Sequence, residues 1–394
     1  MGAHDVVITG LGLVSCLGEG VDAHWRALTA ADATPAIDTE RYPPYTIHPL
    51  PAIDWSLQIP KRGDQRQMET WQRLGTYAAG LALDDAAMKD EAMCASMDMV
   101  IAAGGGERDE AVDAMILAAS EARPDLGVLL NEKLTTELRP TLFLAQLSNL
   151  LAGNISIVHK VTGSSRTFMG EEGSGISAVQ TAAARIASGQ SDHVLVGGAF
   201  ETEHPDMLLG YELGGYLHRD TWKPVWQRQG SVGGGLVSAS GAGFLVLESR
   251  AHAEARGRKP YAVLDKVVAG RSSRKGDLAA EIGKLLESCL PGEHPALCLS
   301  AASGAHAATA AEKSALDARG SIAARGFATR TGHLKEAAFP FAVALAAIVV
   351  SRRTPYPAFD AASEAAYGGP VDAVLATSVG YHRAEGVALV TADA

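Results

Sequence analysis

Apolar residues occur in this chain in two alternating patterns. Short unbroken apolar runs are typical of strands buried on both faces. Such runs begin near Val6, Met97, His193, Gly241 and Ala296. Between them lie stretches with helical spacing of apolar residues, including 67–88, 172–188 and 278–290. Strands that alternate with helices in this way predict an α/β fold built in layers.

The second half of the chain repeats this alternation. The pattern predicts a strand at 296–300, a helix at 308–318, a strand-like stretch at 322–329, a long apolar helix at 335–351, and strands at 372–378 and 386–391. We therefore expect two related lobes, residues 1–250 and 251–394. Residues 34–66 and 203–230 lack periodicity and are predicted to be surface excursions. Residues 107–150 are predicted to be mostly helical.

Composition narrows the possible function classes. The chain has 394 residues, of which 47% are hydrophobic, and a formal net charge of −11. A large core is expected, whereas nucleic acid or an anionic membrane surface is not an expected partner. An acidic carrier protein remains compatible with this charge, because a local basic patch is enough to dock one.

The cysteines and histidines carry no metal or redox signal. Cys16, Cys94, Cys289 and Cys298 form no Cys-x-x-Cys pair, and the histidines lack metal-ligand spacing. Each cysteine is expected to be a buried thiol in a reducing cytoplasm. The longest apolar run, 337–350, is too short to span a membrane and predicts a buried core helix.

The most informative segment, 163–192, runs from a turn of small residues into an alanine-rich helix. It resembles the active-site elbow of the β-ketoacyl-acyl-carrier-protein synthases, in which a cysteine begins the helix. Gly189 and Asp192 match the Gly-x-x-Asp that follows this elbow. Counting back from them places the cysteine position at Glu172.

Three further motifs support the resemblance. They are the opening Val6–Gly18 with Trp25, the strand Gly241–Glu248, and the triplet Thr331-Gly332-His333. Through them the chain is identified as a member of the β-ketoacyl-acyl-carrier-protein synthase family. The resemblance implies a thiolase-like fold, layered αβαβα, in one compact unit. The chain is also similar to chain-length factors, and to synthase-like proteins of alphaproteobacterial clusters that make very-long-chain acyl groups for lipid A.

Most of the catalytic residues of that family are replaced here. Active members hold the acyl chain on the cysteine and use two histidines, a lysine and a glutamate around it. By the resemblance, the cysteine position is Glu172, the first histidine position is Ala301 and the lysine position is Ala328. His333 and Glu312 are retained. A carboxylate cannot carry a usable thioester, so a degenerate site is predicted.

Several roles remain open for the residues at this position. An anion at a helix N-terminus gains roughly 0.3–1 kcal/mol, so Glu172 can cap the helix and fill a dead site. It can instead act as a catalytic base, and Glu171 is a second candidate for the position. His333 is either a structural residue or an acid/base, and His306 is a neighbouring candidate for the lost histidine.

The positions that bind the carrier are also altered. By the resemblance, two threonines that contact phosphopantetheine become Ser303 and Ala305, and the glycine-rich gate becomes Gly380-Tyr381-His382-Arg383. Tyr381 keeps a ring at the gate, but two bulky residues replace glycines and restrict the loop. We expect no resident cofactor or metal, and the phosphopantetheine arm of an acyl carrier protein is the possible ligand.

Three functions are compatible with these residues. The first is a non-condensing, chain-length-factor-like subunit of fatty acid synthesis that works with an acyl carrier protein and pairs with a cysteine-bearing ketosynthase, or forms a homodimer. The second is an acyltransferase or decarboxylase that uses Glu172 and His333. The third is a carrier-binding module without chemistry.

By the resemblance, pairing uses edge strands and helices near 141–157. The apolar residues in this stretch either face a shared acyl tunnel or form ordinary core. They are Leu142, Phe143, Leu144, Leu147 and Leu150.

Overall fold

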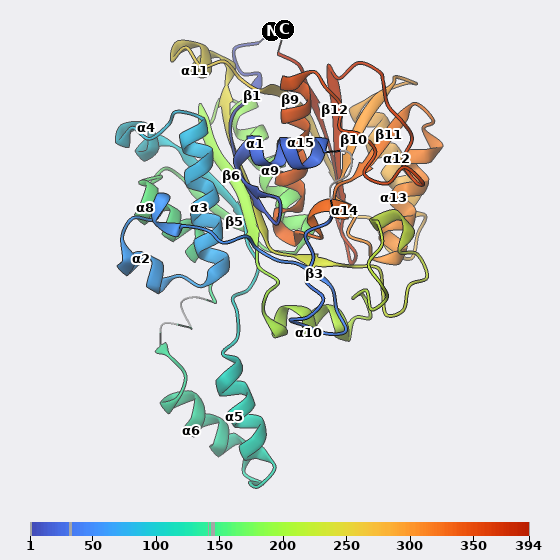
Figure 1. The fold of residues 1–394 in the computed structure, drawn as a ribbon. Coiled ribbons are helices and arrows are strands. Elements are labelled where there is room, and N and C mark those ends of the chain that lie inside the picture. The colour runs from blue at the N-terminus through green and yellow to red at the C-terminus, as the bar shows by residue number, and fades with distance from the viewer. Residues whose placement is uncertain (1, 31–33, 141, 143–145, 394) are drawn as a thin grey trace.

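The computed structural model describes residues 2–30, 34–140, 142 and 146–393. They form a layered body from which one helical hairpin projects (Figure 1). The strands of the main sheet are β1 (Val6–Ser15), β2 (Gly18–Glu19), β4 (Asp98–Ala102), β5 (Ser165–Phe168), β6 (His193–Phe200), β8 (Gly241–Ser249), β9 (Ala262–Gly270), β10 (Ala296–Ser300), β11 (Ile322–Gly326), β12 (Ala373–Val379) and β13 (Glu385–Thr391). A separate small sheet pairs β3 (Ile47–His48) with β7 (Ser238–Ala239).

Helices cover the sheet and fill its centre. They are α1 (Gly20–Thr29), α2 (Arg62–Gln67), α3 (Thr70–Asp85), α4 (Glu91–Ser96), α5 (Glu110–Ser120), α6 (Leu126–Thr136), α8 (Leu150–His159), α9 (Glu172–Ala187), α10 (Pro205–Leu213), α11 (Arg250–Ala255), α12 (Leu278–Cys289), α13 (His306–Ala318), α14 (Ala328–Thr331) and α15 (Ala338–Arg352). Three short 3-10 turns lie at η1 (Trp55–Leu57), η2 (Val225–Gln227) and η3 (Lys335–Ala337).

The main sheet is continuous through both halves of the chain. Within the described residues its eleven strands run in the order β11-β10-β12-β13-β9-β1-β8-β6-β4-β5, with β2 paired to β1. The halves meet where β1 pairs with β9, through Val7 opposite Val263 and Ile8 opposite Ala262. Strands from the start and the middle of the chain therefore share the seam between the two predicted lobes.

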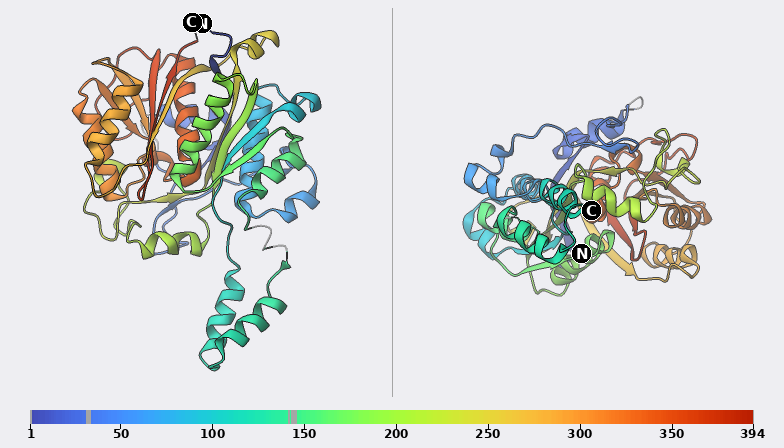
Figure 2. Two further views of the ribbon diagram at one scale, coloured as in Figure 1. Left: turned by 180° about the vertical axis from the view of Figure 1, so that it is seen from behind. Right: turned by 90° about the horizontal axis from the view of Figure 1, so that it is seen from below.

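Five layers result from this arrangement. α9 and α15 lie in the middle and contact strands of both halves, α3 and α8 cover the N-terminal half, and α12 and α13 cover the C-terminal half (Figures 1 and 2). The predicted layering αβαβα is confirmed. The division into lobes at residue 250 stays a prediction, because the continuous sheet does not separate two folding units.

The central helix α15 is apolar on every side. Its residues from Ala338 to Val350 are all buried, which is typical of a helix enclosed within a large core. Close packing against the sheet requires glycine at Gly243 on β8, where an added Cβ would lie 2.8 Å from the backbone nitrogen of Phe341. No helix in the described ranges has both the length and the apolar character that crossing a membrane requires.

The structure adds elements that the apolar pattern does not predict. β5 is short and polar, and α10 lies inside the segment 203–230 that was predicted to be a surface excursion. The predicted helix 335–351 begins at Ala338 and is preceded by η3. The helical prediction for 107–150 is confirmed for α5 and α6, but these helices project from the body (Figure 1).

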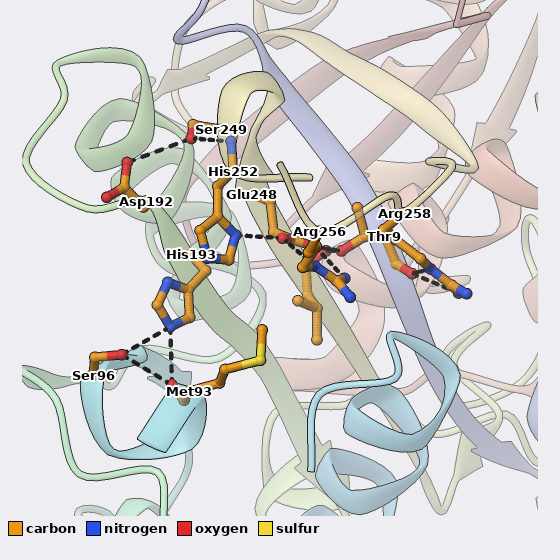
Figure 3. A network of polar contacts seen from close by, with 11 residues as sticks. Thr9, Met93, Ser96, Asp192, His193, Glu248, Ser249, His252, Arg256 and Arg258 are labelled. Atoms are coloured by element: carbon orange, nitrogen blue, oxygen red, sulfur yellow. Dashed lines mark hydrogen bonds and ion pairs between the residues drawn. The ribbon is translucent and has the colours of Figure 1, made fainter. Parts of the chain in front are cut away.

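A buried carboxylate ties the N-terminal strands together. Glu248 on β8 accepts two hydrogen bonds from Arg256, at 2.8 and 2.6 Å, and lies 2.6 Å from Nδ1 of His252. It also accepts a hydrogen bond from the hydroxyl of Thr9 on β1. The His252 ring stacks on His193 of β6, with ring centroids 4.7 Å apart (Figure 3). Burial raises the pKa of Glu248, but its hydrogen-bond partners outweigh that effect and hold the pKa below its usual value.

We predict that Glu248→Gln lowers the free energy of unfolding by about 3 kcal/mol at neutral pH, because Arg256 and His252 lose their buried anion. Since the carboxyl pKa is lowered in the folded state, this contribution is present above the ordinary carboxyl pKa and is lost as pH falls below it. Urea unfolding of both proteins at neutral and acid pH measures the effect. Glu254→Gln, at an exposed position on α11, is the control and should change stability by at most about 0.5 kcal/mol.

Candidate active site at the start of α9

The chain enters α9 through a strained turn. Glu171, just before the helix, has φ 58° and ψ −135°, a backbone conformation that is uncommon for residues other than glycine. Glu172 is the first residue of α9, and its side chain points into the protein, leaving 1% of the residue exposed. The side chain of Glu171, the residue that precedes the helix, makes no capping hydrogen bond in the described structure.

The structure brings together two of the predicted site residues. Nε2 of His333 lies 3.0 Å from Oε1 of Glu172, and both side chains are buried. The contact is not aligned as a hydrogen bond, and neither ring nitrogen has another partner within the described part of the chain. Gly332, with φ 69°, turns the chain so that the histidine faces α9. The result is a buried carboxylate–imidazole contact at the helix start.

Two charged neighbours of this contact, Lys335 and Glu336, were not predicted from the sequence. Lys335 has a left-handed φ of 44°, and its Nζ lies 3.5 Å from Oε1 of Glu336. Burial lowers the pKa of Lys335, but the charges of Glu336, Glu171 and Glu172 more than offset that effect, so its pKa lies above the usual value. Burial also raises the pKa of Glu336, against the opposing effect of Lys335. The available sequence signal was a pair of adjacent charges directly before the apolar run 337–350.

Aromatic rings close the space around this charged cluster. The Lys335 Nζ lies 5.2 Å from the ring centroid of Phe200 and 5.9 Å from that of Tyr211. Tyr211, also missed from the sequence, packs edge-on against His333 at 6.2 Å between centroids. Its hydroxyl is buried without a hydrogen-bond partner within the described chain. Burial raises the pKa of this tyrosine well above its usual value.

The remaining predicted catalytic positions add no functional group to the Glu172–His333 contact. Ala301 and Ala328 are buried and carry no functional group. Glu312 on α13 accepts hydrogen bonds from Ser300 at 2.7 Å and Thr377 at 2.6 Å. Burial raises its pKa, and these two hydrogen bonds oppose the rise. Glu312 therefore fixes the ends of β10 and β12 and is engaged there rather than with Glu172.

The predicted gate is held closed by several contacts. The Tyr381 hydroxyl donates a hydrogen bond to the Glu171 carboxylate, and its ring packs against Tyr216 at 4.6 Å between centroids. The Gly380 N–H donates to Ala384 O at 2.9 Å, and the Gly380 carbonyl accepts from Arg274 at 2.6 Å. A side chain at Gly380 would collide with the Arg383 carbonyl, since an added Cβ would lie 2.1 Å from it.

The predicted carrier-contacting residues are engaged within the protein. Ser303 is buried, and its hydroxyl accepts a hydrogen bond from the Ala305 N–H at 3.2 Å. Nε2 of His306 lies 3.0 Å from the Arg228 carbonyl. His306 therefore has a structural partner in the Arg228 backbone.

Two spaces border the charged cluster beside the Glu172–His333 contact. A depression of about 510 Å³ is lined by Gly104, Gly105, Met169, Gly170, Glu171, Lys335, Glu336, His382 and Arg383. A second, water-sized cavity of about 10 Å³ lies behind Lys335 and Glu336. Neither Glu172 nor His333 lines either space. The arrangement places an acid and an imidazole in contact, away from the lining of both spaces.

The cysteines offer no replacement nucleophile. All four are free. Burial raises the pKa of Cys16 and of Cys298 to about 12 each, and that of Cys289 to about 11. Thiols that stay protonated at neutral pH are poor nucleophiles. Across the described ranges, no group of three or more His, Cys, Asp or Glu side chains is arranged to hold a metal ion.

Comparison with known proteins identifies the family. Residues 3–253 match the model of the N-terminal domain of β-ketoacyl synthases. The chain belongs to the β-ketoacyl synthase family. The match spans the elbow segment and the strand Gly241–Glu248, so the family resemblance of these two segments is confirmed.

Curated members of this synthase family align with part of the chain. It is 29% identical over 283 residues to 3-oxoacyl-[acyl-carrier-protein] synthase 2 of Rhizobium meliloti (strain 1021), covering 65% of this chain and 62% of that protein. It is 27% identical over 256 residues to the tetracenomycin polyketide synthase ketoacyl synthase beta subunit of Streptomyces glaucescens, covering 62% and 58%. The matched region thus spans less than two thirds of the length of these relatives.

Solved ketosynthase structures share the whole fold of this synthase-family chain. The ishigamide ketosynthase/chain length factor matches with a TM-score of 0.78 and 20% identity, over 99% of both chains. A type II polyketide synthase ketosynthase, solved in complex with its acyl-carrier protein, matches with a TM-score of 0.74 and 17% identity, also over 99% of both chains. At these identities the likeness shows the fold, and the predicted thiolase-like α/β fold is confirmed.

We predict that Lys335→Met destabilises this ketosynthase-family chain by about 3 kcal/mol, because it leaves buried carboxylates without their cation. The pKa of Glu336, already raised by burial, rises further without Lys335. The loss of stability should therefore be greatest at neutral pH and shrink as pH falls and the carboxyl groups take up protons. Thermal and urea unfolding at neutral and acid pH measure this dependence.

Two variants control this experiment. Lys284→Met removes a lysine whose side chain is 70% exposed and should cost at most about 0.5 kcal/mol. Adding Glu336→Gln to Lys335→Met should recover part of the lost stability. If Lys335→Met lowered the free energy of unfolding by the same amount at all pH values, the electrostatic cause would be contradicted.

Proposed function

We propose that this chain is a non-condensing subunit of a β-ketoacyl synthase assembly, similar in role to a chain-length factor. It pairs with a cysteine-bearing synthase, which performs the condensation and receives acyl groups from an acyl carrier protein. The products are fatty acyl chains, with very long chains as the expected class. The observation that carries the proposal is the buried Glu172–His333 contact at the start of α9.

The chemistry of this site supports a non-condensing role. Condensation needs a thiolate at the helix start and donors that stabilise the enolate of the extender unit. Glu172 offers a carboxylate in place of the thiolate, and Ala301 and Ala328 offer no polar atom. The negative charge of Glu172 also opposes the approach of a malonyl carboxylate.

The projecting hairpin supports pairing with another chain. α5 and α6 extend away from the body (Figures 1 and 2) and carry exposed apolar side chains. These are Met115, Leu117, Leu126, Val128, Leu130 and Leu134, with exposed fractions from 38% to 69%. Apolar surface of this kind marks protein interaction sites.

The end of the sheet offers a second surface for pairing. β5 is the last strand in the order and pairs only with β4 among the described strands. An open groove of about 540 Å³ runs beside it, lined by residues of α8 and β5 that include Gly153, Ser156 and Thr167. An unpaired edge strand is a template for pairing with another chain. Ile157 on α8, 59% exposed, lies in the predicted pairing stretch 141–157.

The apolar residues proposed for a shared tunnel divide into three groups. Phe143 and Leu144 lie outside the described residues. Leu142 is buried within this chain, and Leu150 is half-buried. Leu147, 39% exposed, is the one of the described three that a partner can most readily contact.

The nature of the related proteins also favours a pairing role. One curated relative is a ketoacyl synthase beta subunit, and one structural match is a ketosynthase/chain length factor. Another match is a ketosynthase in complex with its acyl-carrier protein. An acyl carrier protein is therefore the carrier that we propose for the assembly.

A condensation assay followed by mass spectrometry tests the proposal. Acyl and malonyl carrier proteins are incubated with this chain alone and with a co-expressed cysteine-bearing synthase. We expect no elongation or decarboxylation by the chain alone, and elongation with altered product length when the partner is present. Leu117→Glu with Leu130→Glu should abolish co-purification of the partner, whereas Glu121→Gln, an exposed change on the same hairpin, should not.

Turnover by the chain alone would contradict the proposal and favour an acyltransferase or decarboxylase that uses Glu172 and His333. Binding of a carrier protein without any partner or turnover would instead favour a carrier-binding module.

A second prediction concerns the nucleophile position itself. Glu172→Cys should not be acylated by acyl carrier protein, because neither space beside the cluster reaches position 172 and the gate is bonded shut. Intact-protein mass spectrometry measures the added acyl mass. Glu171→Cys, which faces the open depression, is the matched control and should react readily with iodoacetamide. If Glu172→Cys is acylated and catalyses condensation, this prediction is wrong. The glutamate at position 172 would then be the single change that inactivates the site.

A further inference from the structure

The projecting hairpin joins the body through a short segment, Gly104 to Arg108, which we call its root. This segment follows β4 and leads into α5 at Glu110. The Arg108 N–H donates to Asp206 at 3.1 Å, and Nδ1 of His204 lies 3.2 Å from Glu110. Where the chain returns from the hairpin, the Gln146 amide donates to the Glu107 carbonyl at 3.2 Å. The root is therefore attached to the segment that follows β6.

Two buried carboxyl groups face each other at this root. Glu107 is 6% exposed and Glu201, after β6, is 8% exposed. Both carboxyl groups line the same water-sized cavity, and a hydrogen bond between two carboxyl groups requires that the pair hold a proton. One oxygen of Glu107, Oε1, is buried without a partner in the part of the chain that the structure describes.

Burial, and then the contact with Glu201, raises the pKa of Glu107 to about 8. Burial likewise raises the pKa of Glu201. The hydrogen bond to Asp206, the largest effect on His204, raises its pKa against burial. The folded root thus shifts the pKa of each of these three groups upward, toward its protonated form.

The carboxyl pair also adjoins the charged cluster at the start of α9. Glu107, Glu201, Lys335 and Glu336 line the same water-sized cavity, together with Trp71. Further charged groups act on the pair from the surrounding elements. They are Glu69, directly before α3, Arg73 of α3, and His204 after β6. Displacement of the root therefore disturbs the wall against which Lys335 and Glu336 pack.

We propose that the Glu107–Glu201 carboxyl pair is a proton-dependent latch that holds the root of the hairpin to the body and links the hairpin to the charged cluster beside Glu172. With a shared proton the two groups attract each other. With both groups ionised they repel each other in a buried site, and the root separates from Glu201. The biological purpose, adjustment of the hairpin to a partner, rests on the proposed function, whereas the latch itself is a property of this chain alone.

The direction of the pH dependence follows from linkage. A carboxyl pKa that is raised in the latched state means that this state binds more protons than the open one. Latching is therefore complete below the ordinary carboxyl pKa and is lost as pH rises through about 8, the pKa of Glu107. In that window the opening constant rises by up to about tenfold for each pH unit.

Hydrogen exchange of the full chain tests the latch. Exchange is followed by mass spectrometry in peptides that cover 103–113 and 199–208, at about pH 6 and about pH 8.5, and corrected for the intrinsic exchange rates. We expect protection of both peptides to fall by about tenfold or more at the higher pH. Glu107→Gln and Glu201→Gln should each remove this difference, because a glutamine amide donates to the remaining carboxylate at both pH values.

Matched variants distinguish the latch from a pH response of the neighbouring His204 contact. Glu121→Gln, an exposed change on the hairpin, should behave as the unchanged protein. Equal protection at both pH values in the unchanged chain would overturn the proposal. A pH response that persists in both glutamine variants but disappears in His204→Asn would also overturn it, because the titrating contact would then be the one at His204.

The same variants separate the latch from the proposed function. If the exchange result is as expected but no synthase partner co-purifies, the proposed function fails and the latch stands. If the partner co-purifies and the glutamine variants leave the pH response unchanged, the latch fails and the proposed function stands.

Discussion

Enclosure of α15 between the two halves of the sheet is the constraint on which the site depends. Because this helix is apolar on every side, it is stable only inside the molecule, and the residues that precede it are drawn into the interior with it. His333, Lys335 and Glu336 occupy that approach and meet the start of α9. The contact is close: an added Cβ at Gly175 of α9 would lie 2.5 Å from the Glu336 carbonyl. The packing of two central helices thus determines which side chains surround Glu172.

Burial of charge then limits what the site can do. A buried carboxylate is tolerated where a cation, a helix N-terminus or hydrogen bonds compensate for lost hydration. Glu172 stands at the N-terminus of α9, and Lys335 lies within reach of its charge and those of Glu171 and Glu336. The Tyr381 hydroxyl satisfies Glu171 from the gate side. These groups compensate one another within the chain, which favours a structural role for a position where the family places its nucleophile.

Much of this could be predicted from the sequence, and the failures have physical causes. Strands buried on both faces, such as β6 and β8, and the apolar α15 carry strong local patterns. The polar edge strand β5 has no such pattern, because only pairing with β4 makes it a strand. Glu172 and His333 were found by counting from motifs, and the structure places them in contact. Lys335, Glu336 and Tyr211 were not predicted from the sequence. They come together only in the folded chain, where α10, η3 and α9 meet.

The hairpin connects this closed interior with the outside of the molecule. Leu117, 69% exposed, and Leu126, 51% exposed, lie on the two helices of an arm that projects from the body (Figure 2). Burial of one such side chain against a partner would stabilise the assembly by roughly 1.5–3 kcal/mol. The root of that arm ends on buried, ionisable groups that share a cavity with Lys335. If the proposed partner covers this arm, it binds a segment whose root lines the same cavity as Lys335 and Glu336, so the partner would reach the charge around Glu172 without a ligand in the site itself.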